Sequence, residues 1–127
     1  MAQATAELTM STNPEAVWAV VGDFHGLAAW MPGIDSVVSE GDDRVLSTMG
    51  LEIRERLVNL DESGRSVSYS IIEGAPVESH TATITVHADG DGSRVTWDVA
   101  ATPDEMAGFM QGVYAGALEA LKTHVGG

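Results

Sequence analysis

The spacing of hydrophobic positions divides the chain into three parts. Apolar residues fall at helical spacing between Asn13 and Gly33, alternate with polar residues from there to Pro103, and return to helical spacing after Pro103. A period near 3.6 residues is typical of an amphipathic helix, and a period of two indicates a strand with one buried face. The sequence therefore predicts short helices, then a run of strands, then one long helix.

The first helical part is expected to form two short helices. Asn13 suits an N-cap and Pro14 suits the first helical position, so the first helix should begin there abruptly. Glycines and a proline then break the helical pattern. Two such helices must close over either a solid core or a cavity. Their large aromatic residues are Trp18, expected to anchor them to the sheet, Phe24, and Trp30, expected near the mouth of a cavity.

The middle part predicts an antiparallel meander, because turn signals separate its alternating segments at regular distances. The turns are rich in glycine, aspartate and proline. The predicted strands cover residues 34–40, 44–49, 53–60, 65–72, 77–88 and 93–100, and residues 6–10 are expected to add a seventh.

The alternation also assigns side chains to faces of the sheet. It is clearest between residues 78 and 87, where one face is apolar and the other polar. Glu55 and His80 fall on faces that are otherwise apolar, and Trp97 points inward, so Asp98 should point outward. The inward positions are Ile53, Glu55, Leu57, Val67, Tyr69, Ile71, His80, Ala82, Ile84, Val86, Val95, Trp97 and Val99.

The last part predicts a helix of about 20 residues, roughly 30 Å long, which could cross a whole small domain. Thr102, Pro103 and Glu105 are expected to form a capping box with proline at its first position. A sheet would have to curl around so long a helix. Its expected apolar stripe is Met106, Phe109, Met110, Val113, Ala117 and Leu121, with Tyr114 and Leu118 on one flank.

Glycines recur every four residues on this helix, at Gly108, Gly112 and Gly116. Each interior glycine costs about 1 kcal/mol relative to alanine. The pattern leaves two interpretations open: close approach of a strand or partner, or simple tolerance.

Composition narrows the classes of partner. The chain has 127 residues, which fits one domain, and carries 19 acidic against 6 basic residues, a net charge of −13. Such a charge repels nucleic-acid phosphates and anionic membrane surfaces, so neither partner is expected. The absence of cysteine excludes disulfides and thiolate metal sites, and no apolar stretch is long enough to span a membrane. We therefore expect a soluble, cytoplasmic protein.

The order of predicted elements and several motifs resemble a known superfamily. The motifs are VWAVVGDFHGLAAWMP, ERLVNLD, YSIIEG and TPDEMAGFMQGVYAGALEALK. They resemble the START and birch-pollen-allergen-like helix-grip superfamily, and more narrowly its bacterial polyketide cyclase/dehydratase (SRPBCC) group. The resemblance implies an α+β fold over residues 1–127, with a curled seven-stranded antiparallel sheet around the terminal helix. It also implies a cavity for lipids, hormones or aromatic polyketides.

A more distant resemblance to plant abscisic-acid receptors suggests individual pocket positions. By this resemblance Asp98 is also a pocket carboxylate, although alternation directs it outward, so its placement stays open. The segment STMGL lacks the gating loop of those receptors, and the early strands have no lysine to pair with a ligand carboxylate, which disfavours a hormone-receptor role. The matching positions are Glu55, Tyr69, His80, Phe109, Val113 and Ala117.

Three of these side chains could support catalysis without a metal or other cofactor. A buried Glu55 would have a raised pKa and could transfer protons with His80, while Tyr69 could donate a hydrogen bond to a carbonyl or enolate oxygen. Together they could promote an aldol-type cyclisation and loss of water. The alternative is that all three are wall residues that satisfy one another's hydrogen bonds.

The sequence thus predicts a cavity that binds a hydrophobic, aromatic or polyketide-like molecule. It leaves open whether the protein is a cyclase or dehydratase, a non-catalytic carrier or sensor, or an interaction subunit, and it leaves a homodimer open. The candidate ligand-binding residues are Trp30, Ile53, Leu57, Ile71, Ala82, Asp98, Met106, Phe109, Met110, Val113 and Ala117.

Overall fold

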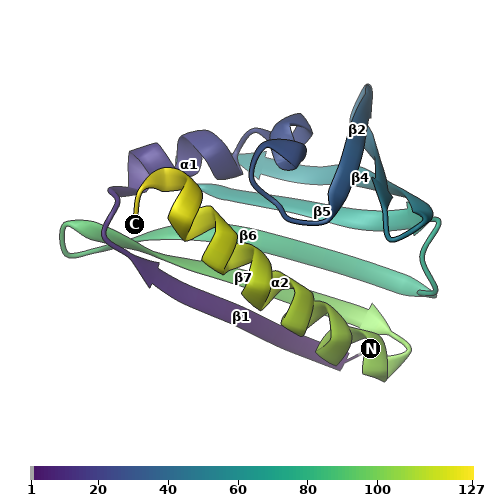
Figure 1. Cartoon of the computed structure of the whole chain (residues 1–127). Helices are drawn as coiled ribbons and strands as arrows, with labels where there is room; N and C mark the ends of the chain where they lie inside the picture. The colour runs from purple at the N-terminus through teal and green to yellow at the C-terminus, as the bar shows by residue number, and fades with distance from the viewer. Residues whose placement is uncertain (1) are drawn as a thin grey trace.

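The computed structural model describes residues 2–127 and confirms the predicted order of elements. A curled antiparallel sheet carries a long helix across its concave face, and two short helices close one end (Figure 1). The elements are β1 (Ala2–Met10), α1 (Pro14–Val21), the 3₁₀ helix η1 (Phe24–Ala29), β2 (Ile34–Glu40), β3 (Asp43–Thr48), β4 (Leu51–Asp61), β5 (Ser66–Glu73), β6 (Ser79–Asp89), β7 (Gly92–Thr102) and α2 (Asp104–Val125).

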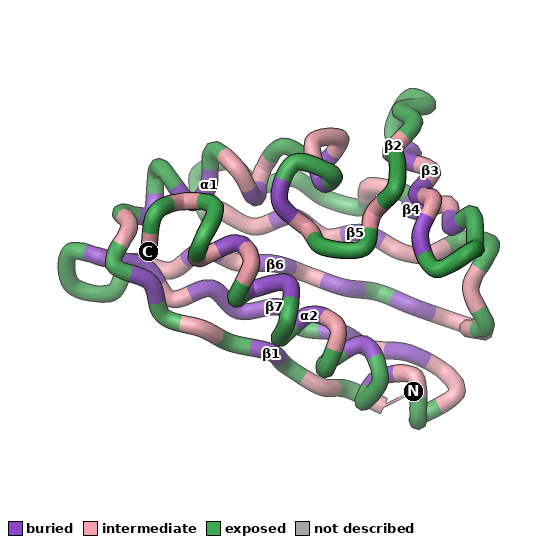
Figure 2. Tube along the Cα trace, in the orientation of Figure 1, coloured by how far each residue is buried: buried purple, intermediate pink, exposed green. Residues whose placement is uncertain are grey.

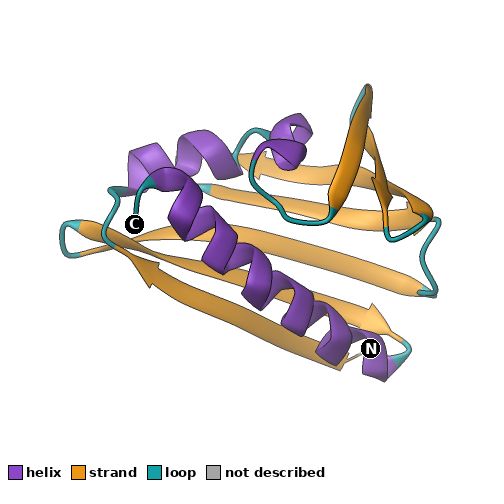
Figure 3. Ribbon diagram, in the orientation of Figure 1, coloured by secondary structure: helices purple, strands orange, loops and turns teal. Residues whose placement is uncertain are grey.

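The sheet has the strand order β1-β7-β6-β5-β4-β3-β2. Strands β2 to β7 form a meander, and β1 pairs with β7, so β1 and β2 form the two edges of the sheet (Figure 3). Helix α2 packs mainly on β1 and β7. The opposite half of the sheet, formed by β2 to β5, curls away from that contact (Figure 1).

The predicted alternation on β6 is confirmed, because the side chains of His80, Ala82, Ile84 and Val86 are all buried. Strand β4 departs from simple alternation. Its pairing with β5 shifts register between Leu57 and Asn59, and the residues beyond that point are exposed. An irregularity of this kind changes which face a strand presents to the core.

The two α-helices begin in different ways. The Asn13 side chain accepts a hydrogen bond from the Ala16 N–H at 2.9 Å, with Pro14 next in the chain, as predicted. The predicted capping box of α2 is wrong: Thr102 belongs to β7, and Pro103 is the N-cap, with no side-chain hydrogen bond to cap the helix.

The buried stripe of α2 is rotated from the predicted one (Figure 2). Phe109 is 54% exposed and Val113 only half-buried, whereas Tyr114 and Leu118, expected on the flank, are buried. The buried residues are Ala107, Met110, Tyr114, Ala117, Leu118 and Leu121.

The three α2 glycines lie on the exposed side of the helix. A Cβ atom added at Gly108, Gly112 or Gly116 would meet no atom of residues 2–127 within 4 Å. Close packing by a strand of this chain therefore does not explain the glycines. Neither helix in the described part of the chain combines the length and apolar character needed to cross a membrane.

Replacing an α2 glycine should stabilise the protein. We expect Gly112→Ala to raise the free energy of unfolding by about 0.5–1 kcal/mol, because alanine restricts the unfolded chain and meets no clash in the helix. Urea unfolding would measure the change. Gly92→Ala in β7 is the contrasting variant, since its Cβ would clash with the Met10 carbonyl oxygen and should destabilise the fold. Destabilisation by Gly112→Ala would show that the glycine face is packed in solution.

Candidate functional site

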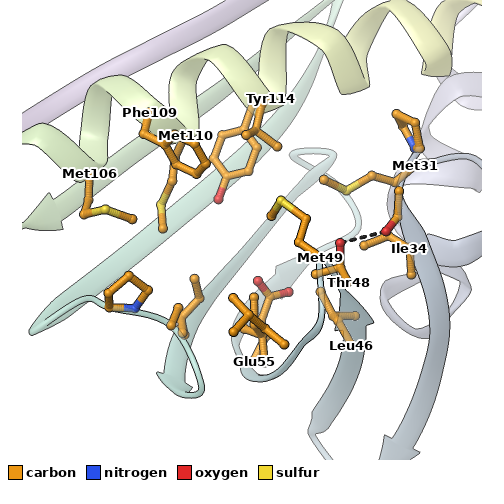
Figure 4. Close-up of a pocket in the computed structure, with 18 residues that line it drawn as sticks. Met31, Ile34, Leu46, Thr48, Met49, Glu55, Met106, Phe109, Met110 and Tyr114 are labelled. Atoms are coloured by element: carbon orange, nitrogen blue, oxygen red, sulfur yellow. Dashed lines mark hydrogen bonds between the residues drawn. The ribbon is translucent and has the colours of Figure 1, made fainter.

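A cavity of about 430 Å³ lies between α2 and the β3 to β5 part of the sheet (Figure 4). Its volume falls within the range of small-molecule sites. The loop after η1 and the β5–β6 connection complete the wall. The lining residues are Met31, Pro32, Gly33, Ile34, Leu46, Thr48, Met49, Leu51, Ile53, Glu55, Ile71, Ala75, Pro76, Met106, Phe109, Met110, Val113 and Tyr114.

The wall is almost entirely apolar, and its open end is marked by exposed hydrophobic side chains. Met49 is 66% exposed, Leu51 42% and Phe109 54%, although all three line the cavity. Met31 and Met106 also line the cavity, and both are partly buried. Methionine side chains are unbranched and polarisable, so this wall can adapt to ligands of different shape.

Seven sequence-predicted residues line this cavity and seven do not. Ala82 and Ala117 lie in the solid core. Trp30 packs against Trp97, with ring centroids 6.1 Å apart, rather than at the mouth. Leu57 packs against the core beside the irregular part of β4. The lining residues are Glu55, Ile53, Ile71, Met106, Phe109, Met110 and Val113; the others are Tyr69, His80, Trp30, Leu57, Ala82, Asp98 and Ala117.

Asp98 is the clearest correction. It is exposed on the outer face of β7, where its Oδ1 accepts a hydrogen bond from the Thr5 hydroxyl at 2.7 Å. Alternation placed this residue correctly, because Trp97 beside it is buried. The pocket position suggested by the distant resemblance is wrong for Asp98.

Glu55 is held by Arg44, a residue that the sequence analysis did not single out. Oε1 of Glu55 accepts from Nε of Arg44 at 2.8 Å and lies 2.8 Å from Nη2. The Arg44 and Glu55 side chains are only 4% and 7% exposed. The two residues face each other in the register of β3 and β4. Pairing these strands from the sequence could have revealed the partner.

Arg44 also ties the sheet to the short helices. Its Nη1 donates to the Phe24 carbonyl oxygen at 2.6 Å, and its guanidinium lies 3.9 Å from the centre of the Phe24 ring and 4.8 Å from that of Tyr69. A guanidinium over aromatic faces is favoured by the charge distribution of the rings. Burial raises the pKa of Glu55, while the Arg44 charge and hydrogen bond oppose that change.

Tyr69 and His80 lie behind the cavity wall in a hydrogen-bonded network. The Trp97 indole N–H donates to the Tyr69 hydroxyl at 3.1 Å, and that hydroxyl donates to the Tyr114 hydroxyl at 3.3 Å. Nε2 of His80 lies 3.3 Å from the same Tyr114 oxygen. Tyr114 therefore separates both predicted catalytic residues from the cavity.

The network is uncharged near neutral pH. Burial lowers the pKa of His80 to about 4 and raises the pKa values of Tyr69 and Tyr114, and the Glu55 carboxylate contributes to both tyrosine shifts. Nδ1 of His80 accepts the Ile71 backbone N–H at 3.0 Å, so this nitrogen carries no proton. Among residues 2–127, no group of three or more acidic or histidine side chains could hold a metal ion.

This fold and cavity define a helix-grip protein with a site for hydrophobic small molecules. The chain belongs to the family described as polyketide cyclase/dehydrase and lipid transport, whose model matches residues 1–126. Family and fold together support a role in binding a hydrophobic ligand and confirm the resemblance found in the sequence.

Several solved structures share the fold along nearly the whole chain. The protein XoxI from Bacillus cereus is 32% identical, with a TM-score of 0.90, over 97% of this chain and 94% of that one. A protein from Bacillus thuringiensis is 30% identical, with a TM-score of 0.90, over 98% of each chain. Ara h 8.0201 is 19% identical, with a TM-score of 0.76 over 97% of this chain and 96% of that one, and shows the fold alone. No curated protein matches the sequence.

Removing Arg44 alone should strongly destabilise the protein. Arg44→Met leaves the Glu55 carboxylate buried without its cation, which should lower the free energy of unfolding by about 3–5 kcal/mol in urea titrations at pH 7. The double variant Arg44→Met with Glu55→Leu removes both charges and should recover most of that loss. If the free energy of unfolding of Arg44→Met lies within about 1 kcal/mol of the wild-type value, this ion pair does not have the importance assigned to it.

His80 should make stability depend on pH. Above pH 6.5 it is neutral in both folded and unfolded chains; between pH 6.5 and about 4 only the unfolded chain takes up the proton, so stability falls as pH falls. The full effect is about 3 kcal/mol. Urea titrations from pH 7.5 to 4.5 should show a shallower decline in His80→Gln, whereas His124→Gln, at an exposed position, should follow wild type. Equal slopes in His80→Gln and wild type would contradict the burial of a neutral His80.

Proposed function

We propose that the cavity binds an uncharged hydrophobic molecule, aromatic or polyketide-like, and releases it unchanged, as a carrier or sensor does. The observation that supports this most is the apolar wall of a cavity of about 430 Å³ that opens at an exposed apolar rim. An apolar ligand would bury its surface in such a site and cover the rim at the same time.

The arrangement of polar groups favours binding over acid–base catalysis by the three predicted residues. Of these, only Glu55 lines the cavity, and its carboxylate is engaged by Arg44. Tyr69 and His80 do not line the cavity, and burial keeps His80 neutral. Proton transfer by all three to one ligand would require them to reach the same space, which this geometry does not support.

The net charge of the chain and the carboxylate in the cavity wall both favour an uncharged ligand. The whole chain carries a net charge of −13, and the cavity wall contributes the carboxylate of Glu55, whose counter-charge on Arg44 lies behind the wall. An anionic ligand would approach against this field, and a cation would have to give up its hydration in an apolar chamber.

Filling the cavity should abolish binding of an apolar probe. N-phenyl-1-naphthylamine is uncharged and fluoresces in apolar surroundings, so its titration into the protein measures occupancy. Val113→Trp places a large ring in the cavity from α2 and should raise the Kd at least tenfold, about 1.4 kcal/mol. Ala115→Trp, on the exposed side of the same helix, is the matched control and should bind like wild type. Equal binding by wild type and Val113→Trp would show that the probe sits elsewhere and would overturn the proposal.

A further inference from the structure

The hydroxyl of Tyr114 is the end of the buried network that reaches the cavity. Tyr114 is buried, with only 5% of its surface exposed, and also lines the cavity, whereas Tyr69, Trp97 and His80 do not line it. Figure 4 shows the Tyr114 hydroxyl pointing from α2 into the space that the Glu55 carboxylate faces from the opposite wall.

The direction of the hydrogen bond between His80 and Tyr114 follows from the backbone contact of His80. Nδ1 of His80 accepts the Ile71 N–H, and a neutral imidazole carries one proton, so that proton is on Nε2. Nε2–H therefore donates to the Tyr114 oxygen, because a protonated nitrogen cannot accept. The Tyr69 hydroxyl accepts a hydrogen bond from the Trp97 indole N–H and donates its own O–H to the same Tyr114 oxygen.

Both contacts of Tyr114 thus use its oxygen as an acceptor, and its own proton has no acceptor within residues 2–127. A buried O–H without an acceptor is costly unless a ligand or water completes it. The two contacts are long, at 3.3 Å each, so both are weak hydrogen bonds. Burial raises the pKa of Tyr114, so the group remains a donor throughout the physiological range.

The opposite wall offers the complementary group. Arg44 contacts Oε1 of Glu55 through both Nε and Nη2, so the guanidinium holds one side of the carboxylate while the carboxylate itself belongs to the cavity lining. A carboxylate accepts hydrogen bonds at both oxygens and has capacity beyond the two contacts from Arg44. Thr48 adds a hydroxyl to the lining, but its proton is already donated to the Gly33 carbonyl oxygen at 2.7 Å.

We infer that Tyr114 and Glu55 form a polar clamp for a hydroxyl group on an otherwise apolar, uncharged ligand. The ligand oxygen accepts from Tyr114, and the ligand O–H donates toward Glu55. A hydroxyl is the simplest group that does both; an ether or ketone offers only an acceptor, and a carboxylate would place a second negative charge beside Glu55. The inference rests on the proposed function, because it assigns a ligand class to the same cavity.

A series of naphthalenes that differ in one substituent separates the inference from the proposed function. 2-Methylnaphthalene reports apolar binding alone, 2-naphthol offers both donor and acceptor, 2-methoxynaphthalene only an acceptor, and 2-naphthoate an anion. Calorimetric titrations with wild type and Tyr114→Phe would give the dissociation constants. In Tyr114→Phe, 2-naphthol should bind about tenfold more weakly, whereas 2-methylnaphthalene should change less than twofold, which also shows that the variant is folded.

Wild type should bind 2-naphthol more tightly than 2-methoxynaphthalene, and 2-naphthoate most weakly. Thr81→Val removes a hydroxyl at an exposed position of β6 outside the cavity lining, and it should leave the preference for 2-naphthol intact. If Tyr114→Phe affects 2-naphthol and 2-methylnaphthalene equally, or if 2-naphthoate binds most tightly, the clamp is wrong although the cavity binds apolar molecules. If 2-methylnaphthalene fails to bind wild type, the proposed function itself fails.

Discussion

The contact between Trp97 and Tyr114 sets the distance between α2 and the sheet. Their rings stack with centroids 4.0 Å apart and planes within 2° of parallel. Trp97 comes from the middle of β7, and Tyr114 from the middle of α2. Two large rings in contact hold the helix at a fixed height, so the half of the sheet that curls away cannot be filled by α2. The solid core on one side and the cavity on the other both follow from this one spacing between α2 and the sheet.

The Arg44 and Glu55 pair performs a related task at the other side of the cavity. A carboxylate cannot move into apolar surroundings without its cation, and Arg44 is fixed by the Phe24 carbonyl and by two aromatic rings. The wall at β4 is thereby joined to β3 and to η1. This arrangement explains how an acidic residue can line an apolar cavity while the surrounding walls keep their shape.

Much of the fold could be predicted because single residues carried strong local signals. Asn13 and Pro14 start a helix in only one way, and the strict alternation around His80 and Ala82 allows only one buried face. The phase of α2 could not be predicted, because apolar residues surround much of it, and only the sheet decides that Tyr114 rather than Phe109 turns inward. For the site, the sequence identified which residues face inward. It could not distinguish those that fill the core from those that line the cavity, since both halves of the sheet have apolar inner faces.

An apolar cavity has an energetic cost that the rest of the fold must offset. Atoms around an unfilled volume lose dispersion contacts, so a protein with such a cavity is less stable than one with a filled core. Ala117 and Leu118, which are almost completely buried on α2, lie on the solid side and help to supply the missing stability. A ligand that fills the chamber would restore the lost contacts and stabilise the folded state by an amount that grows with the logarithm of its concentration. The same spacing between α2 and the sheet that weakens the empty protein thus provides part of the free energy of binding.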